Sequence, residues 1–340
     1  MSDDAGSPQP FTFDGGRVDP GEIGDYRYRI SETYLGDPVR IPVTIVNGER
    51  AGPTVFLSAA SHGDELNGIE VVREVADRFD PSELAGTLVC LPILNVPGFL
   101  FQERYLPIYD RDLNRSFPGD SESTSAKRMA HRIFYNFIEP CDVGVDFHTS
   151  TRGRTNTLHV RADMSDPEVA RLANAFGRPV IIDSDGASGM LRTEAAAVGA
   201  PTITVEMGEA HRFQRDLIDE ALLGVDNVLA EYGLTETQSV DWPGWRTVIS
   251  RDEKTWLRAD AGGLVEMHRT TGELVERGER VCTISNPFKT EQVVVTAPFD
   301  GVLVGVLENP VVYPGNPLCH VVELDETTQR AYRKRHARSG

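Results

Sequence analysis

Apolar segments of strand length alternate with segments of helical periodicity from about residue 54 to residue 232. The strand-like segments are short and rich in Val, Ile and Leu, whereas the segments between them repeat apolar residues every three or four positions. Such alternation predicts an α/β fold, in which helices cover a mostly parallel or mixed sheet. We expect strands at 54–59, 86–93, 141–147, 157–161, 179–183 and 201–207, and helices at 68–80, 123–137, 167–176, 191–198 and 215–232.

The pattern changes on both sides of this region. Residues 1–17 are polar and rich in Gly and Pro, so we expect them to be disordered. The α/β domain is predicted to span 18–237, with an N-terminal β segment that includes the strand-like stretch 26–46. Short β segments broken by Gly, Pro and Asn predict a small all-β, barrel-like domain at 244–325. A basic tail, 326–340, is expected to be solvated.

Composition narrows the class of protein and its partners. The 340-residue chain has a formal net charge of −18, which argues against a nucleic-acid partner. It has no apolar run near the ~20 residues of a membrane helix and no signal-peptide pattern at its start, so we expect a cytoplasmic protein without a membrane partner. Lys supplies only four of the 34 basic residues, and this acid excess suggests a halophilic, high-salt cytoplasm. The four cysteines are far apart and are expected to be reduced and buried. Whether copies associate into a homo-oligomer stays open.

One apolar strand runs into a polar turn that carries His62 and Glu65, three positions apart. Ligands of open α/β sheets bind at the carboxyl ends of strands, so this turn is a suitable place for a metal. Hydrolytic zinc sites use three protein ligands and a water, and His₂Glu is one known set. A second apolar strand ends in His148, which taken alone could be a structural histidine but beside the first two completes the set. We predict one Zn²⁺ per chain. Asp146 is a candidate to orient a ligand imidazole, or it faces the other side of its strand.

A hydrolase also needs a base, and Glu206 fits because it ends an apolar strand and is followed by Met-Gly. A buried carboxylate there needs a partner, and the water at a metal site is a natural one. A surface glutamate at a strand end is the alternative, and Glu209 lies close by in the following loop. The loop at 104–119 carries several arginines, which offer planar forks for a carboxylate or for a scissile carbonyl. An Arg-rich solvated loop is the alternative.

Taken in order, these pieces resemble the succinylglutamate desuccinylase/aspartoacylase family of zinc carboxypeptidase-like hydrolases over about residues 40 to 325. The matching pieces include Ile41-Pro-Val-Thr-Ile-Val-Asn-Gly48, His62-Gly-Asp-Glu65-Leu-Asn-Gly68, Leu91-Pro-Ile-Leu-Asn95, Arg104-Tyr105, Asp112-Leu-Asn-Arg115-Ser-Phe-Pro-Gly119, Asp146-Phe-His148-Thr149 and Val205-Glu206-Met-Gly208. The resemblance implies the same three zinc ligands. It also implies that Glu206 activates water and protonates the leaving amine, that Arg104 polarises the amide carbonyl, and that Asn114 and Arg115 hold an α-carboxylate.

A narrower similarity covers 154–163 and 189–192, which resemble a branch of bacterial and archaeal deacylases within the same family. It makes four side chains secondary candidates for acyl or carboxylate contacts, while structural ion pairs are the alternative for one or two of them. These candidates are Arg154, Asn156, Arg161 and Arg192.

The stretch 272–301 resembles a lipoyl- or biotinyl-like barrel, with Lys289 near the hairpin tip that bears the cofactor in carrier proteins. The residues around Lys289 lack the usual carrier motif, so a cap that narrows the active-site cleft is the favoured interpretation. Tyr313 is a candidate to reach into that cleft.

The predicted function is zinc-dependent hydrolysis of a linear, non-peptide amide bond, which removes an acyl group from a small N-acyl amino acid. One alternative is a zinc metallocarboxypeptidase that trims peptides with the same metal set. A second alternative is a non-enzymatic carrier or scaffold.

Overall fold

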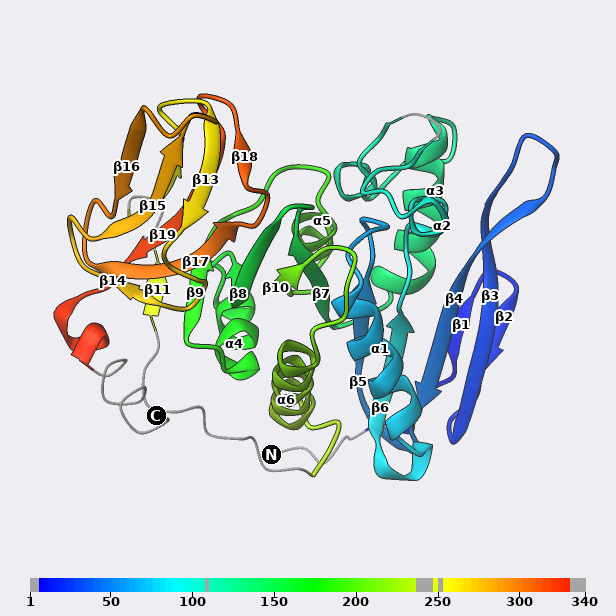
Figure 1. Cartoon of the computed structure of the whole chain (residues 1–340). Coiled ribbons are helices and arrows are strands. Elements are labelled where there is room, and N and C mark those ends of the chain that lie inside the picture. The colour runs from blue at the N-terminus through cyan, green and yellow to red at the C-terminus, as the bar shows by residue number, and fades with distance from the viewer. Residues whose placement is uncertain (1–5, 108–109, 237–246, 250–252, 331–340) are drawn as a thin grey trace.

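The computed structural model describes residues 6–107, 110–236, 247–249 and 253–330 (Figure 1). Its centre is four parallel strands in the order β10-β7-β5-β6. They are β5 (Arg50–Ala59), β6 (Ala85–Leu91), β7 (Val143–Ser150) and β10 (Thr202–Glu209). Antiparallel strands extend this sheet on both sides, so the predicted mixed α/β sheet is confirmed. They include β4 (Pro38–Asn47) and β3 (Glu22–Glu32) beside β6, and β8 (Arg154–Ala162) beside β10.

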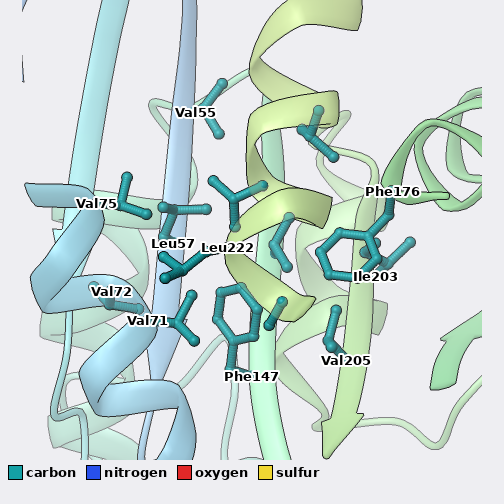
Figure 2. Close-up of a cluster of buried hydrophobic side chains, with 14 of the residues drawn as sticks. Val55, Leu57, Val71, Val72, Val75, Phe147, Phe176, Ile203, Val205 and Leu222 are labelled. Carbon is teal, nitrogen blue, oxygen red and sulfur yellow. The ribbon is translucent and has the colours of Figure 1, made fainter. Parts of the chain in front are cut away.

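Helices cover both faces of the sheet. One face packs against α1 (Asn67–Arg78), α4 (Pro167–Phe176) and α6 (Arg215–Glu231) through a large apolar cluster (Figure 2). The other face packs against α3 (Ser125–Ile133), a π-helical turn (Phe134–Ile138) and α5 (Leu191–Ala197). The expected single helix at 123–137 is therefore split, because the wider π turn brings Phe134, Phe137 and Ile138 all into the core.

Alternation along the central strands separates apolar from polar positions. On β7, Val143, Val145 and Phe147 belong to the cluster beneath α1 and α6, whereas Asp146 and His148 point to the opposite face. Because all parallel strands end at the same edge, the polar residues at their carboxyl ends are brought together there.

The C-terminal β region consists of two packed sheets with their own apolar cluster. One sheet contains β12 (Lys254–Arg258), β14 (Leu274–Val275), β17 (Gly301–Leu307) and β19 (Pro317–Glu323). The other contains β13 (Gly263–Met267), β15 (Arg280–Ser285), β16 (Gln292–Thr296) and β18 (Val311–Val312). The region is not a separate barrel, because β17 pairs with β8 and so continues the central sheet. Gly305 permits this contact, since a Cβ there would lie 2.7 Å from Asn156 Oδ1.

Two short strands connect the regions further. β9 (Val180–Asp183) pairs in parallel with β8 on one side and with β11 (Thr247–Ile249) on the other. The expected boundary between the two predicted domains falls at 237–246, outside the described residues.

The expectation of disorder through residue 17 is wrong for its second half. Residues Phe11–Phe13 (β1) and Gly16–Val18 (β2) form an antiparallel hairpin. The ring of Phe13 packs edge-on against Tyr26 at 4.9 Å and lies 5.1 Å from Phe137. These aromatic contacts, together with buried Phe11 and Val18, dock an otherwise polar segment.

The remaining expectations concern the ends of the chain and the cysteines. Residues 326–330 are helical, and the rest of the predicted basic tail lies outside the described residues. All four cysteines are buried and unpaired, as expected. None of the helices in the described part of the chain has both the length and the apolar character needed to cross a bilayer.

Candidate metal centre and catalytic cavity

The turn after β5 positions His62 and Glu65 at the edge of the sheet. β5 ends at Ala59, and Ala60 adopts a left-handed conformation with φ 49° that turns the chain. Gly63 then lies so close to α2 (Val96–Phe101) that a Cβ would come within 2.0 Å of the Gly98 carbonyl carbon. A glycine is therefore required for this turn to pack, and the packing holds the two polar side chains in place.

His62, Glu65 and His148 form a compact buried cluster, as the sequence predicted. The Nδ1 atoms of His62 and His148 each lie 2.9 Å from a different oxygen of the Glu65 carboxylate. All three residues are less than 5% exposed, and their potential ligand atoms lie within 4.8 Å of one another. A carboxylate and two imidazoles converging in this way match the donor set of a hydrolytic zinc site.

The second nitrogen of each imidazole faces another carboxylate. His62 Nε2 lies 3.2 Å from Asp112 Oδ1, and His148 Nε2 lies 2.8 Å from Asp146 Oδ2. Asp146 is itself fixed by Ser58, whose hydroxyl donates to Oδ1 at 2.7 Å. Carboxylates in these positions orient ligand histidines and leave the opposite nitrogen for a metal. Asp146 therefore faces the cluster, and Asp112 is a partner that the sequence did not assign.

The electrostatics of the cluster favour positive charge at its centre. Burial acts to raise the pKa of Glu65, but the two imidazoles outweigh it and hold this pKa well below the usual value. Burial acts to lower the pKa of His148, but Asp146 and Glu65 raise it well above the usual value. The pKa of His62 is raised in the same way, against burial, by Glu65 and Asp112. A field that draws protons onto buried imidazoles also suits a divalent cation, so the residues fit a zinc ion.

Glu206 lies beside this cluster on the next strand. In the parallel ladder of β10 and β7 its Cα partner is His148, so both side chains leave the same face of the sheet. Its carboxylate accepts a hydrogen bond from Asn156 Nδ2 at 3.1 Å and lies 3.2 Å from Arg161 Nε. Glu209, the alternative base, instead pairs with Arg212 at 2.9 Å. The geometry therefore favours Glu206 over Glu209 as the candidate base.

A single cavity of about 460 Å³ joins these groups. Eleven of the candidate residues that the sequence singled out line it. They are His62, Glu65, Arg104, Asn114, Arg115, His148, Arg154, Asn156, Arg161, Arg192 and Glu206.

Comparison with known proteins places the chain in a family. The model for the succinylglutamate desuccinylase/aspartoacylase catalytic domain matches residues 51–232, more than half of the chain. The chain belongs to the succinylglutamate desuccinylase/aspartoacylase family.

Relatives of this family match over most of the chain. An N-alpha-acetyl-L-2,4-diaminobutyric acid deacetylase from Halomonas elongata is 27% identical over 303 residues, which cover 85% of this chain and 87% of the relative. A crystal structure of a succinylglutamate desuccinylase/aspartoacylase from Rhodobacter sphaeroides has a TM-score of 0.78 at 26% identity and covers 90% of this chain and 95% of its own. The product-bound ectoine utilization protein EutE (DoeB) from Ruegeria pomeroyi has the same fold, with a TM-score of 0.78 at 23% identity, covering 89% and 95% of the two chains.

In this family member the arginines around the cavity differ in how they are held. Arg104 reaches the centre, with one guanidinium nitrogen 2.5 Å from Glu65 Oε1. The side chain of Arg115 is half-exposed, and its guanidinium donates to the backbone carbonyl of Asn114 at 2.7 Å. The side chain of Asn114 is buried. Asn114 Oδ1 accepts from the Leu191 amide at 2.8 Å, which fixes its orientation. Asn114 and Arg115 thus lie side by side at the cavity wall.

The secondary candidates divide between the two interpretations that the sequence left open. Arg161 makes an ion pair with Glu206, and Arg192 is buried and donates to the carbonyl of Ser184 at 2.9 Å. Both are held by structural contacts while still facing the cavity. Arg154 lies over the ring of Trp256, with the guanidinium carbon 5.5 Å from the ring centroid.

Several wall residues escaped the sequence prediction. Trp256 of β12 lines the cavity, as do Thr149 and part of the segment between β9 and α5. Tyr313, the expected contribution of the C-terminal region, is instead 78% exposed and outside the lining. The residues around a tryptophan in a short β segment do not predict which way its side chain faces. Only the strand pairing shows that Trp256 faces the cavity. Lys289 lies in the tight β15–β16 connection, the expected hairpin tip.

Proposed function

We propose that this chain is a zinc-dependent amidohydrolase that removes the acyl group from a small N-acyl amino acid. The observation that carries this proposal is the convergence of two imidazoles and one carboxylate beside a second carboxylate, Glu206, in one cavity. Family membership and relatives such as the Halomonas elongata deacetylase support the same class of reaction.

His62, Glu65 and His148 are the residues that would hold the zinc. When bound, zinc supplies a Lewis acid that makes water easier to deprotonate and an amide carbonyl easier to attack. The donor set supports zinc over magnesium or calcium, since imidazole nitrogen suits zinc whereas those two ions prefer all-oxygen sites.

The residues of the chain provide the proton transfers and the positioning. Glu206 takes a proton from the attacking water and returns it to the leaving amine. Arg104, which reaches the centre of the cluster, donates to the carbonyl oxygen as negative charge develops on it. Asn114 and Arg115 bind the α-carboxylate of the amino acid, because both side chains carry N–H donors and both line the cavity.

The size of the cavity supports a small amide over a peptide. Its volume of about 460 Å³ lies at the lower end of the range for small-molecule sites, and Trp256 of the C-terminal β region forms part of its wall. A carboxypeptidase needs an open groove for the peptide on the acyl side of the scissile bond, whereas here the C-terminal β region contributes Trp256 to the wall of the cavity.

The experiment that tests the proposal combines metal analysis with hydrolysis. The purified chain, loaded with zinc and assayed in high salt, should contain one zinc per chain and release free amino acid from N-acetyl and N-succinyl amino acids. Short peptides should be hydrolysed far more slowly. Preferred hydrolysis of peptides would support the carboxypeptidase instead, and a chain without zinc and with added mass at Lys289 would support a carrier.

A further inference from the structure

The hairpin that joins β3 to β4 ends in an arm, residues 31–38, which projects at the edge of the sheet (Figure 1). The ladder between the two strands shifts register between Arg29 and Ser31, at the base of the arm, and such irregularities bend a hairpin. Every residue from 32 to 37 is exposed. The arm is therefore available for contact with another molecule.

The turn at the tip of the arm is held firmly and presents two apolar side chains. The amide of Thr33 donates to the Asp37 carbonyl at 2.7 Å, and the carbonyl of Thr33 accepts from the Gly36 amide at 3.0 Å. The Thr33 hydroxyl also accepts from the amides of Leu35 and Asp37 at 3.3 and 3.2 Å. Tyr34 and Leu35 are 82% and 89% exposed, whereas turns usually carry Gly, Asn or Asp. Apolar side chains on a preorganised turn suit the anchors of a protein interface, because little entropy is lost when they bind.

A notch with a volume of about 710 Å³ lies at the base of the same arm. One wall is the end of β3 with the start of the arm, and the other wall is α3 with the loop before it. None of the described residues that line this second wall is acidic, although the chain has a net charge of −18. They are Ser121, Ser123, Ser125, Arg128, His131 and Arg132. The notch is therefore suited to a segment that carries negative charge.

Two side chains of the α3 wall have unused hydrogen-bonding capacity. His131 Nδ1 is buried and has no hydrogen-bond partner among the described residues. The Arg128 side chain is exposed and makes no ion pair within the part of the chain that the structure describes. Arg132, in contrast, donates to Asp14 at 3.0 Å and to the Tyr28 hydroxyl at 3.1 Å. A segment bound in the notch would thus meet Arg128 and His131 as its polar partners.

The arm and the notch are complementary in charge. Residues 31–39 include Glu32 and Asp37 but no basic residue. Because a net charge of −18 makes copies of the chain repel one another, self-association requires a contact between opposite charges. From Ser31 to Leu35 the arm spans about 13 Å at 3.3 Å per residue. Two arms that cross antiparallel about a twofold axis therefore place each tip at the base of the other arm, where the notch lies.

We infer that the chain forms a homodimer in which the arm of each copy occupies the notch of the other. Tyr34 and Leu35 are the apolar anchors, and Asp37 pairs with Arg128 of the partner subunit. The contact is reciprocal, so each interaction is made twice. The arm and the notch share no lining residue with the catalytic cavity, so loss of the dimer should leave hydrolysis unchanged.

The mass of the native chain in solution provides the first test. Light scattering after size-exclusion chromatography in high salt should give twice the mass of one chain at micromolar concentration. In Tyr34→Ser/Leu35→Ser the Kd of the dimer should rise about 100-fold or more, since buried anchors dominate interface energies. Phe288→Ser is the matched control, because Phe288 is 83% exposed in the C-terminal region, and it should stay dimeric. A monomeric native chain, or a double variant with native affinity, would overturn the inference.

An exchange of charges tests the pairing itself. Arg128→Glu should weaken the dimer about tenfold or more because the notch then repels Asp37, and Asp37→Arg should do the same because the tip then repels Arg128. Mixing the two variants should restore association, since each tip then meets a notch of opposite charge. Variants that dimerise with native affinity alone, or that fail to associate when mixed, would exclude the arm–notch pairing.

A disulfide between subunits tests where the tip lies. The four native cysteines are buried, so thiols introduced at the surface should react with each other. A chain with Leu35→Cys, mixed with a tagged chain that carries Ser123→Cys, should give a disulfide-linked mixed dimer under mild oxidation. The same chain mixed with Phe288→Cys is the control and should not. Equal yields from the two mixtures, or no mixed dimer from the first, would contradict the arm–notch contact.

Discussion

Glu206 and His148 are direct partners in the parallel ladder between β10 and β7. Two strands far apart in sequence thus deliver a carboxylate and an imidazole to the same face, one strand spacing apart. The relationship makes the distance between the proposed base and the proposed metal a property of the sheet. It depends on backbone hydrogen bonds more than on the flexibility of a loop.

Replacing Glu206 with Gln should abolish catalysis without removing the metal. The amide keeps the shape and the Asn156 contact but cannot take a proton, so turnover should fall about 10³-fold or more. Zinc content by mass spectrometry and kcat on an N-acyl amino acid measure the two effects. Glu209→Gln is the matched control, because Glu209 pairs with Arg212 and lies outside the cavity lining. Near-normal turnover in Glu206→Gln would remove the base assignment.

Replacing His148 with Ala should reduce zinc occupancy sharply. The substitution removes one of the three donors, leaves Asp146 buried without its imidazole partner, and leaves Glu65 with one imidazole in place of two. Zinc should then be lost on dialysis that leaves the native chain loaded. His268→Ala serves as the control, since the ring of His268 lies in the C-terminal region, where it shares a hydrogen bond with Thr283 and does not line the cavity. Unchanged zinc in His148→Ala would mean that another side chain is the third ligand.

The unfolding free energy should fall in acid because of His320. Burial first, and then the charges of Arg161 and Lys254, lower its folded pKa from the ordinary value of 6.5 to about 3. The unfolded chain therefore binds more protons between these values, so the contribution of His320 is complete above pH 6.5 and is lost as the pH falls toward 3. The slope is at most about 1.4 kcal/mol per pH unit.

Urea unfolding of the metal-free chain between pH 7.5 and pH 4.5 measures this slope. His320→Phe keeps an aromatic ring against Trp256 but cannot take a proton, so its unfolding free energy should depend less steeply on pH. Parallel curves for the native chain and the variant would exclude His320 as the source.

Replacing Gly63 with Ala should disrupt the metal-binding turn. The new Cβ would come within 2.0 Å of the Gly98 carbonyl carbon, and backbone on both sides prevents an easy adjustment. We expect a loss of about 1–3 kcal/mol in unfolding free energy together with weaker zinc binding. Thermal unfolding with and without zinc measures both. Gly6→Ala, where the structure has nothing within 4 Å of the added Cβ, should change neither.

Local sequence patterns predicted which polar side chains come together at the edge of the central sheet. His62, Glu65, His148 and Glu206 all end or follow apolar strands, and parallel strands bring such ends to one edge. The register between strands could not be predicted, so the direction of Asp146 stayed open until the structure placed it against His148. The orienting role of Asp112 was missed because its partner, His62, is fifty residues away in sequence.

The two ends of the chain were harder to predict. Composition suggested disorder at the N-terminus, but the contacts of Phe13 with Tyr26 and Phe137 help to hold this polar segment in an ordered hairpin. Trp256 reaches the cavity only through the ladder that runs from β12 across β19 and β17 to β8. The sequence of a five-residue strand contains no information on such a chain of pairings.

The pairing of β17 with β8 also bears on how substrate enters. Gly305, Val306 and Leu307 are partners of Asn156, Thr155 and Arg154, so the strand that supplies cavity residues is hydrogen-bonded directly to the C-terminal region. A hinged opening of that region would have to break these hydrogen bonds next to the catalytic groups. Access must therefore come from movement of side chains and connecting loops around a rigid frame, and the part of the cavity wall that β8 supplies keeps its shape through the catalytic cycle.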